Sequence, residues 1–372
     1  MITVQGHTVS IEYQESLPPI SSILRVPGLG LGDVFPLLNG FLAFSTLKPQ
    51  IQQTICVSQT VYNALPPLLL PPNMRFTCIP VSNAGDRYRV YKEYADQLIH
   101  TTNILNPDAI IWSFACKRNA LLEHAKEKNI YRVSLPPLSR KTFVKEDFSA
   151  FVDTTPHSSC TPQNSLHVSL LFGKLPYLPL LSQSEQKSFL FEGEHQVQLD
   201  LLPQHEANAA HKLALICPRS SLPERSMKNA DLLSLLKIIV KETNLHSIVV
   251  SVASAEEKNE IHEVIKSNFG SNILGRIQTI SGDIQEVVGK IHAASCIFSV
   301  DTGIPHIAAQ VVSTDTLVVV FMPNEENGSL WGYKRHNWFN LPLTSSKTID
   351  SCRKLLVSHK LQAKAQKPSQ CA

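Results

Sequence analysis

The sequence has no apolar run of the roughly 18 residues that a membrane-spanning helix requires. Its first residues, Met-Ile-Thr-Val-Gln-Gly, also lack the basic patch and hydrophobic stretch of a secretory signal. Charged residues make up only 17% of the chain, and the formal net charge is +3. The aromatic residues are not interleaved with Lys and Arg, as they are in many nucleic-acid-binding surfaces. We therefore expect a cytoplasmic protein without a nucleic-acid partner.

Metal and disulfide motifs are missing as well. The sequence contains neither HExxH nor a paired CxxC, so it predicts no metal site and no metal cofactor. The 8 cysteines are scattered along the chain, and several lie in apolar runs that are typical of strands. We interpret them as small buried hydrophobic residues in a reducing compartment.

The chain is long enough for two domains, because its 372 residues exceed the roughly 250 to 300 at which one core usually divides. Short apolar runs alternate with amphipathic stretches in both halves, which predicts an α/β fold with parallel sheets wrapped by helices. A polar stretch at 184–210 marks the boundary, and 138–166 reads as a long loop. The predicted strands are 23–26, 54–57, 75–79, 109–113, 131–134, 213–217, 247–252, 276–280, 296–300 and 317–321. The predicted helices are 34–46, 90–101, 120–128, 229–243, 255–269, 284–294, 305–312 and 348–366.

The strand at 296–300 is followed by a turn that suits an anion. Asp301 and Thr302 are favourable residues at a helix start, and Gly303 permits close backbone approach. Pro305 fits the first helical turn, where its missing amide hydrogen costs nothing. The free amides of such a helix start favour a phosphate at the carboxyl edge of the sheet. The alternative is that Asp301 only caps its own helix.

A second strand, 23–26, leads through glycines Gly30 and Gly32 to Asp33 and then into a helix. A dinucleotide-binding GxGxxG fingerprint would need glycine where Asp33 stands, and the strand at 54–57 ends without a carboxylate for a ribose. A nicotinamide cofactor is therefore not predicted. The loop instead delivers one carboxylate, Asp33, whose flanking amides can keep it ionised, as a general base must be.

Taken together, these segments resemble the heptosyltransferase family of GT-B glycosyltransferases, which assemble the inner core of bacterial lipopolysaccharide. The family's glycine-Asp loop matches Gly32-Asp33, and its Asp-Thr-Gly with a following histidine matches Asp301 to Gly303 and His306. Its loop of paired hydroxyl residues followed by a basic residue matches Ser220, Ser221 and Arg225. The chain departs from the usual family residues at three positions, with Arg225 for Lys, Met227 for Trp and Asn324 for Thr.

The resemblance implies two Rossmann-like doubly wound domains that face each other across a cleft. The expected acceptor-binding domain is 1–200, the nucleotide-sugar domain is 201–345, and 346–372 forms a helix that crosses back to the first domain, followed by a basic tail. The resemblance also implies an inverting, metal-independent glycosyltransferase. Its expected donor is ADP-heptose, and its expected acceptor is a hydroxyl of a lipopolysaccharide-type or other glycan or glycolipid. The nucleotide sugar is a co-substrate, and no cofactor is expected.

Such a reaction needs a base on the acceptor side and stabilisation of the departing diphosphate on the donor side. Asp33 is the expected base, and Asp301 is expected to bind hydroxyls of the donor sugar. Glu256, after the strand at 247–252, falls where a ribose-binding carboxylate would stand. His306 belongs either to the donor site or to the buried core. The residues expected to hold the diphosphate are Ser220, Ser221, Arg225, Thr302 and Gly303.

Three alternatives stay open. The donor can be a UDP- or GDP-sugar instead of ADP-heptose, and the acceptor can be lipid A core, another glycan or a protein side chain. The chain can also be a catalytically silent sugar-nucleotide binder that keeps the fold. We interpret the excess of Lys and Arg from Ser346 onward as a solvated helix face. The alternative interpretation is that these residues contact the anionic inner-membrane surface.

Overall fold

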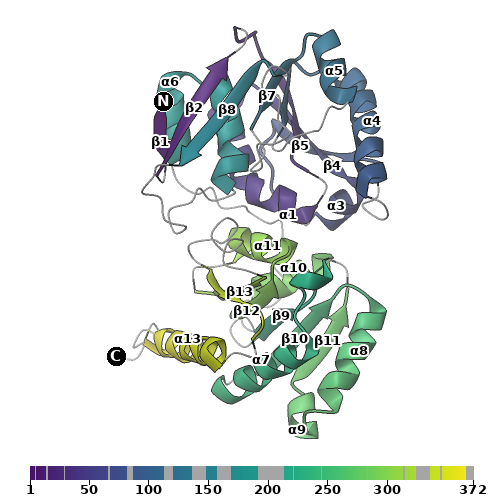
Figure 1. Ribbon diagram of the computed structural model, residues 1–372, viewed down its shortest axis with the longest axis vertical. Coiled ribbons are helices and arrows are strands. Elements are labelled where there is room, and N and C mark those ends of the chain that lie inside the picture. The colour runs from purple at the N-terminus through teal and green to yellow at the C-terminus, as the bar shows by residue number, and fades with distance from the viewer. Residues whose placement is uncertain are drawn as a thin grey trace. The chain divides into compact units, whose positions relative to one another are not determined.

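A computed structural model of the chain divides into two compact units, Met1–Asp200 and Leu201–Ala372. Each unit is a sheet covered by helices (Figure 1). The residues that the structure describes are 1–4, 6–13, 16–28, 30–65, 68–81, 87–112, 120–135, 148–156, 169–191, 213–220, 222–243, 245–282, 284–312, 315–323, 336–343 and 346–365.

Over the described residues, the first unit has an 8-stranded sheet in the order β1-β2-β8-β7-β6-β3-β4-β5. The strands from β8 to β5 run parallel, and β1 and β2 add an antiparallel hairpin at one edge. The strands are β1 Ile2–Val4, β2 His7–Tyr13, β3 Ser22–Val26, β4 Gln52–Ser58, β5 Met74–Ile79, β6 Ala109–Trp112, β7 Tyr131–Ser134 and β8 Ala150–Pro156.

Helices cover both faces of this sheet. The long helix α4 and the shorter α5 pack on a core that includes Leu24, Ile110 and Trp112, while α2 and α6 meet on the other side through the rings of Phe44 and Phe189. The helices are α1 Leu31–Val34, the 3-10 turn η1 Phe35–Leu37, α2 Leu38–Leu47, α3 Gln59–Ala64, α4 Arg87–Leu105, α5 Ala120–Glu127, the π-helix η5 Ser169–Lys174, the 3-10 helix η6 Leu175–Leu180 and α6 Gln183–Phe191.

The structure confirms the predicted strands of this unit to within about two residues, which is the usual uncertainty of strand ends. Two expectations were wrong, and one element was missed. The stretch 138–166 is not all loop, because β8 lies within it and pairs along its whole length with β2. The hairpin β1–β2 was not predicted. The helix expected at 34–46 is interrupted by η1, because Pro36 cannot donate a helical hydrogen bond.

A buried arginine, Arg25, lies in strand β3 of the first sheet. The Arg25 side chain is fully buried, and its guanidinium lies 5.2 Å from the centre of the Phe41 ring and 5.4 Å from that of Tyr177. Arg25 donates hydrogen bonds to the carbonyl oxygens of Ile111 and Phe172. Burial lowers the pKa of Arg25 to about 10, so it stays charged at neutral pH. Arg25 therefore joins the centre of the sheet to η5, which no local sequence pattern predicts.

Helix α2 and the π-helix η5 touch backbone to backbone at Gly40 and Gly173. A Cβ added to Gly40 would overlap the carbonyl group of Gly173 and lie 2.8 Å from its Cα. Since these are backbone atoms, they cannot move aside as a flexible side chain would. We expect Gly40→Ala to lower the free energy of unfolding by about 2 kcal/mol, measured by urea denaturation.

The matched control for this prediction is Gly289→Ala in α10 of the second unit. A Cβ at Gly289 would meet nothing within 4 Å. Alanine favours a helix over glycine, so this change should raise the free energy of unfolding by about 0.5 to 1 kcal/mol. If Gly40→Ala were as stable as the wild type, the close packing of α2 on η5 would be disproved.

Over its described residues, the second unit has a 6-stranded sheet in the order β11-β10-β9-β12-β13-β14, and every neighbouring pair is parallel. The strands are β9 Leu213–Cys217, β10 Ser247–Val252, β11 Ile277–Ser281, β12 Cys296–Val300, β13 Leu317–Met322 and β14 Asn337–Asn340. The helices are the 3-10 turn η7 Pro223–Arg225, α7 Asn229–Glu242, α8 Ala255–Lys266, α9 Ser271–Leu274, α10 Ile284–Ala293, α11 Gly303–Val311 and α13 Ser346–Ala365. The predicted strands of this half are confirmed to within a residue or so of each end, and only β14 was not predicted.

The chain order of this sheet creates a switch point between β9 and β12. From β9 the chain builds outward through β10 and β11, then returns to β12 on the other side and builds outward through β13. Connections that leave two neighbouring strands in opposite directions open a crevice at the carboxyl ends of those strands, and ligands of doubly wound sheets bind there. The segments that follow β9 and β12 carry the residues singled out from the sequence.

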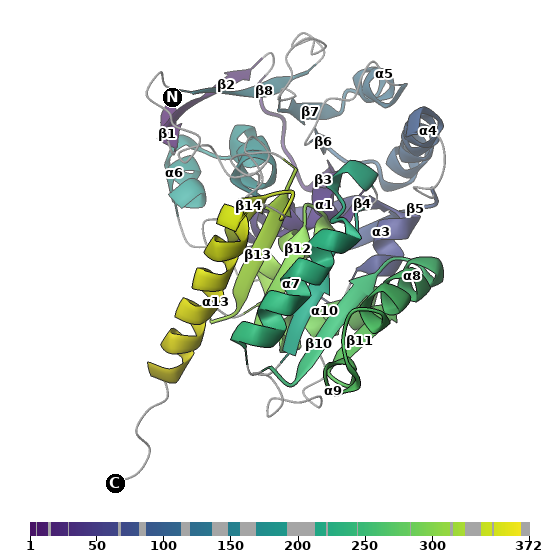
Figure 2. The same ribbon diagram turned by 60° about the horizontal axis from the view of Figure 1, so that its bottom comes forward.

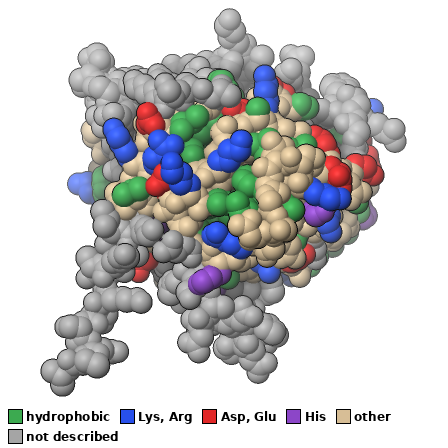
Figure 3. Space-filling model, turned by 90° about the horizontal axis from the view of Figure 1, so that it is seen from below, with side chains coloured by type: hydrophobic (Ala, Val, Ile, Leu, Met, Phe, Trp, Pro, Cys, Tyr) green, Lys and Arg blue, Asp and Glu red, His purple; other side chains and the backbone are tan. Residues whose placement is uncertain are grey.

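The last helix, α13, lies beside α7 (Figure 2) and places Cys352 and Leu356 in the core of the second unit. Its expected crossing to the first domain stays a prediction. Arg353 of α13 forms ion pairs with Glu242 and Asp350, and Figure 3 shows Lys and Arg interspersed with Asp and Glu on the face in view. None of the described helices is both long enough and apolar enough to span a membrane.

The described cysteines are free thiols. Cys56, Cys217, Cys296 and Cys352 are buried, and Cys78 is half-buried. Burial raises the pKa of each of these thiols, so they stay protonated and unreactive at neutral pH. Their interpretation as small hydrophobic residues is therefore confirmed for this part of the chain.

Candidate functional site

In the first unit, the loop after β3 holds the Asp33 side chain in a defined position. The Asp33 Oδ2 atom accepts a hydrogen bond from the Gly30 amide at 2.9 Å, and the Asp33 amide donates to the Gly30 carbonyl at 3.0 Å. A Cβ at Gly30 would lie 3.4 Å from Asp33 Oδ2, so glycine leaves the space that the carboxylate uses. Asp33 is exposed to solvent on α1, which suits a group that must meet an incoming hydroxyl.

In the second unit, the 218–227 loop connects β9 to α7 and closes on itself. The Met227 amide donates to the Pro218 carbonyl at 2.8 Å, which joins the two ends. Within the loop, the Ser226 hydroxyl accepts from the Ser220 amide at 2.9 Å. The Ser220 hydroxyl accepts from the Leu222 amide at 3.2 Å, which forms a local turn. The loop is therefore held in one conformation by its own hydrogen bonds.

The loop and the end of β12 are joined by an ion pair. Arg225 Nη1 lies 3.0 Å from Asp301 Oδ2, with the Arg225 side chain 37% exposed and that of Asp301 9% exposed. Burial raises the pKa of the Asp301 carboxyl, and the positive charge of Arg225 opposes this shift only in part. Arg225 thus supplies the charge that a buried carboxylate needs, and its own outer edge remains accessible to an anion.

Asp301 does not cap helix α11. The capping residue is Thr302, whose Oγ1 accepts from the Ile304 amide at 3.2 Å, and the helix itself begins at Gly303. The interpretation of Asp301 as a simple cap is therefore wrong, and its carboxylate is directed to Arg225 instead. His306 is buried in the same helix, and burial lowers its pKa to about 4. His306 is consequently neutral at physiological pH and brings no positive charge to the site.

Glu256 lies in the first turn of α8, directly after β10, and its side chain is exposed. The helix is capped by its neighbours, since Ser254 Oγ accepts from the Glu257 amide and Glu257 Oε2 accepts from the Ala253 amide at 3.0 Å. The Glu256 amide and the Ser254 hydroxyl lower the pKa of the Glu256 carboxyl, so it is ionised at neutral pH. Ser254 is thus the capping residue, and the exposed Glu256 carboxylate lies at the start of the helix.

The structure brings some of the predicted residues together. Arg225 and Asp301 are in contact, and Ser220 lies in the same closed loop as Arg225. Ser221 and Asn324 lie outside the described residues. Met227, which stands where the family usually has tryptophan, is buried in the core of the second unit. Asp33 belongs to the other unit, so its role as a base stays a prediction.

Arg219 was missed from the sequence, although it directly follows β9. Its Nη1 donates to the Met227 carbonyl, and its Nη2 donates to Asn229 Oδ1 at 2.7 Å. The sequence does show an arginine at the start of the predicted phosphate-binding loop. Its position in the sequence does not reveal that the side chain folds back and binds the end of that loop.

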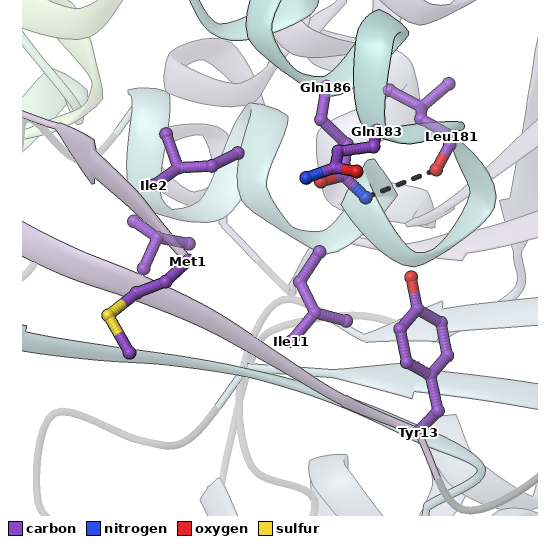
Figure 4. Close-up of a pocket in the computed structure, with 8 residues that line it drawn as sticks. Met1, Ile2, Ile11, Tyr13, Leu181, Gln183 and Gln186 are labelled. Carbon is purple, nitrogen blue, oxygen red and sulfur yellow. Dashed lines mark hydrogen bonds between the residues drawn. The ribbon is translucent and has the colours of Figure 1, made fainter.

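A hollow of about 270 Å³ lies elsewhere, in the first unit, between the β1–β2 hairpin and the start of α6 (Figure 4). Its polar side chains are Tyr13, Gln183 and Gln186, and Gln186 Nε2 also donates to the Leu181 carbonyl at 3.2 Å. The described residues that line it include no Asp, Glu, Lys, Arg or His side chain. Among the described residues, no three His, Cys, Asp or Glu side chains are grouped as metal ligands would be; metal independence nevertheless stays a prediction.

Comparisons with known proteins point to one family. Residues 181–324 match the model of glycosyltransferase family 9, the heptosyltransferase family. No curated protein matches the chain by sequence. Among solved structures, ADP-heptose lipopolysaccharide heptosyltransferase II of E. coli is 13% identical with a TM-score of 0.59, covering 92% of this chain and 99% of that one.

Two further structures have the same fold. E. coli heptosyltransferase WaaC with ADP is 15% identical with a TM-score of 0.58, covering 91% of this chain and 99% of its own. A family 9 glycosyltransferase from Veillonella parvula DSM 2008 is 13% identical with a TM-score of 0.58, covering 93% and 95% of the two chains. At these identities the structures establish the fold, and the similarity to the family rests on the matched segment. Residues 181–324 therefore match glycosyltransferase family 9, the heptosyltransferase family, and the chain as a whole has the two-unit Rossmann-like GT-B fold.

Proposed function

We propose that the protein is an inverting glycosyltransferase that moves a sugar from a nucleoside diphosphate donor to a hydroxyl of a glycan or glycolipid. The observation that carries the proposal is the Arg225–Asp301 ion pair, which lies at the switch point of the second sheet and within the family 9 segment. A cation with an accessible edge and a carboxylate beside it are the groups that a diphosphate and a sugar hydroxyl require.

On the donor side, the diphosphate binds Arg225, the Ser220 hydroxyl and the amides at the start of α11. These groups stabilise the negative charge that grows on the diphosphate as its bond to the sugar breaks. The guanidinium is permanently charged, so it performs this task without a divalent metal. Asp301 accepts hydrogen bonds from hydroxyls of the sugar, and Glu256 accepts from the ribose.

On the acceptor side, Asp33 takes the proton from the attacking hydroxyl. The new bond forms between that oxygen and the anomeric carbon while the bond to the diphosphate breaks, so the proton ends on Asp33 and the electron pair on the diphosphate. Attack from the face opposite the leaving group inverts the anomeric centre. The Gly30 amide, which contacts Oδ2 in the structure, keeps the carboxylate oriented for this step.

The proposed donor is ADP-heptose, and the proposed acceptor is a lipopolysaccharide-type glycan. The support is that E. coli heptosyltransferase II, an ADP-heptose enzyme by its description, and WaaC, solved with ADP, share the fold over almost their whole length. A UDP- or GDP-sugar is the alternative donor, because none of the residues assigned above contacts the nucleotide base.

Thermal melting with nucleotide sugars tests the donor. A ligand at a hundred times its dissociation constant stabilises the native state by about 2.7 kcal/mol, which corresponds to a rise of roughly 3 to 4 °C in melting temperature for a chain of this length. We expect this rise with ADP-heptose and smaller rises with UDP- and GDP-sugars. AMP, which lacks the second phosphate, is the control. Equal melting temperatures with and without all these donors would contradict the proposal.

A catalytically silent sugar-nucleotide binder is the second candidate. One observation favours it. Arg225 and Met227 replace the residues that are usual in the family, and the Met227 side chain is buried in the core of the second unit. Transfer of radiolabelled sugar to an acceptor glycan distinguishes the two functions, because a silent binder would give the thermal shift without any transfer.

A further inference from the structure

A polar cluster lies beside the 218–227 loop and connects it to helix α8. The cluster consists of Arg219, Asn229 and Glu260, and none of these residues was assigned a role in donor binding above. Arg219 Nη2 donates to Asn229 Oδ1 at 2.7 Å, Asn229 Nδ2 donates to Glu260 Oε1 at 2.8 Å, and Arg219 Nη2 lies 3.5 Å from Glu260 Oε1. The side-chain amide of Asn229 therefore bridges the two charges. Its oxygen accepts a hydrogen bond from Arg219, and its nitrogen donates one to Glu260.

The cluster also closes the loop. Arg219 Nη1 donates to the Met227 carbonyl, next to the bond between the Met227 amide and the Pro218 carbonyl. Its side chain is only 15% exposed, so its donors cannot be satisfied by water as freely as those of a surface arginine. Loss of Arg219 would free the end of the loop that follows Arg225.

Glu260 lies on the helix that carries Glu256. The two residues are one helical turn apart, so their side chains share one side of α8. Strands β9 and β10, which precede the loop and α8, are neighbours in the sheet. A nucleoside diphosphate that binds here would place its diphosphate on the loop and its ribose at Glu256, and would thus span the two elements that the cluster joins.

We infer that Arg219, acting through Asn229 and Glu260, is a positioning residue that fixes the spacing between the diphosphate-binding loop and the ribose-binding end of α8. The inference rests on the proposed function, because it concerns how the nucleotide is held. Glu260 sets the spacing between the two elements, whereas Arg219 sets both this spacing and the conformation of the loop.

Calorimetric titration of the full chain with two probes separates these contributions. ADP contacts both the loop and α8, whereas inorganic pyrophosphate contacts the loop alone. In Glu260→Ala the dissociation constant for ADP should rise about tenfold, while that for pyrophosphate stays within about twofold. In Arg219→Met both constants should rise about tenfold or more. Arg219→Lys should retain part of the affinity, since a lysine can still donate to the Met227 carbonyl.

Glu263→Ala is the matched control. Glu263 is an exposed residue of α8, 67% accessible, and forms an ion pair with Lys266. It should leave both dissociation constants unchanged. Hydrogen exchange gives a readout without ligand, because the Ser220 and Met227 amides should exchange faster in Arg219→Met than in the wild type.

The outcomes are distinguishable. If Glu260→Ala weakened ADP and pyrophosphate equally, or neither, the inference would be overturned while the proposed function stood. If Arg219→Met left the affinities and the amide exchange unchanged, the closing role of Arg219 would be overturned as well. If the wild type bound none of ADP, UDP and GDP, the proposed function would fail and this inference with it.

Discussion

Asp33→Asn is expected to reduce the turnover number roughly a thousandfold while the dissociation constant for the donor stays within a few-fold. Asparagine keeps an oxygen that can accept the hydrogen bond from the Gly30 amide, so the loop should keep its conformation. It cannot accept the proton of the attacking hydroxyl, so the chemical step loses its base. Steady-state transfer rates at saturating donor, together with calorimetric titration of the donor, measure the two quantities.

Asp96→Asn is a suitable control for this experiment. Asp96 is an exposed residue on α4 of the same unit and should leave turnover unchanged, which shows that the loss of a carboxylate alone has no effect. Unchanged turnover in Asp33→Asn would remove Asp33 from the role of base. A fall in turnover with a parallel loss of donor affinity would indicate a binding role instead.

Arg225→Met is expected to weaken the binding of a nucleoside diphosphate by about a hundredfold, because it removes the charge that faces the phosphates. Methionine resembles arginine in the length of its apolar stem, and the position is partly exposed, so the fold should tolerate it. The buried Asp301 carboxylate would lose its partner, and its pKa, already raised by burial, would rise further. Calorimetric titration with ADP measures the change in affinity.

Two related variants sharpen this prediction. Arg225→Lys keeps the charge and carries the residue usual in the family, so it should retain most of the affinity. Asp301→Asn removes the carboxylate that competes for Arg225, so ADP should bind at least as tightly as to the wild type, while transfer of the sugar falls. If Asp301→Asn weakened ADP as strongly as Arg225→Met, the division of roles between phosphate and sugar would be wrong.

Sequence patterns predicted most of the two parallel sheets, because strands buried on both faces are continuous apolar runs. Strands β7, β9, β10 and β12 have the predicted bounds. β8 was missed because its sequence, AFVDTTP, mixes apolar with polar residues and ends in proline, features that are common in loops. It becomes a strand through its pairing with β2, which is remote in sequence.

The candidate site could be predicted only in part. Arg225 and Asp301 were found because each follows a predicted strand in a recognisable segment, and the parallel order of β9 and β12 brings those strand ends together. The cluster around Arg219 could not be found in this way. Its members lie on a loop, at the start of α7 and in the middle of α8, and their contacts depend on how the two helices pack on the sheet.

The contact between Gly40 and Gly173 also restricts how this sequence can diverge. A side chain at Gly40 would force α2 away from the π-helix, whereas a Cβ at Gly173 would lie 3.4 Å from Leu37, at an ordinary contact distance. Descendants of this chain that keep the π-helix docked should therefore retain glycine at position 40, even as the surrounding surface drifts. Glycine at position 40 is thus the expected mark of homologues whose first unit keeps this helix packing.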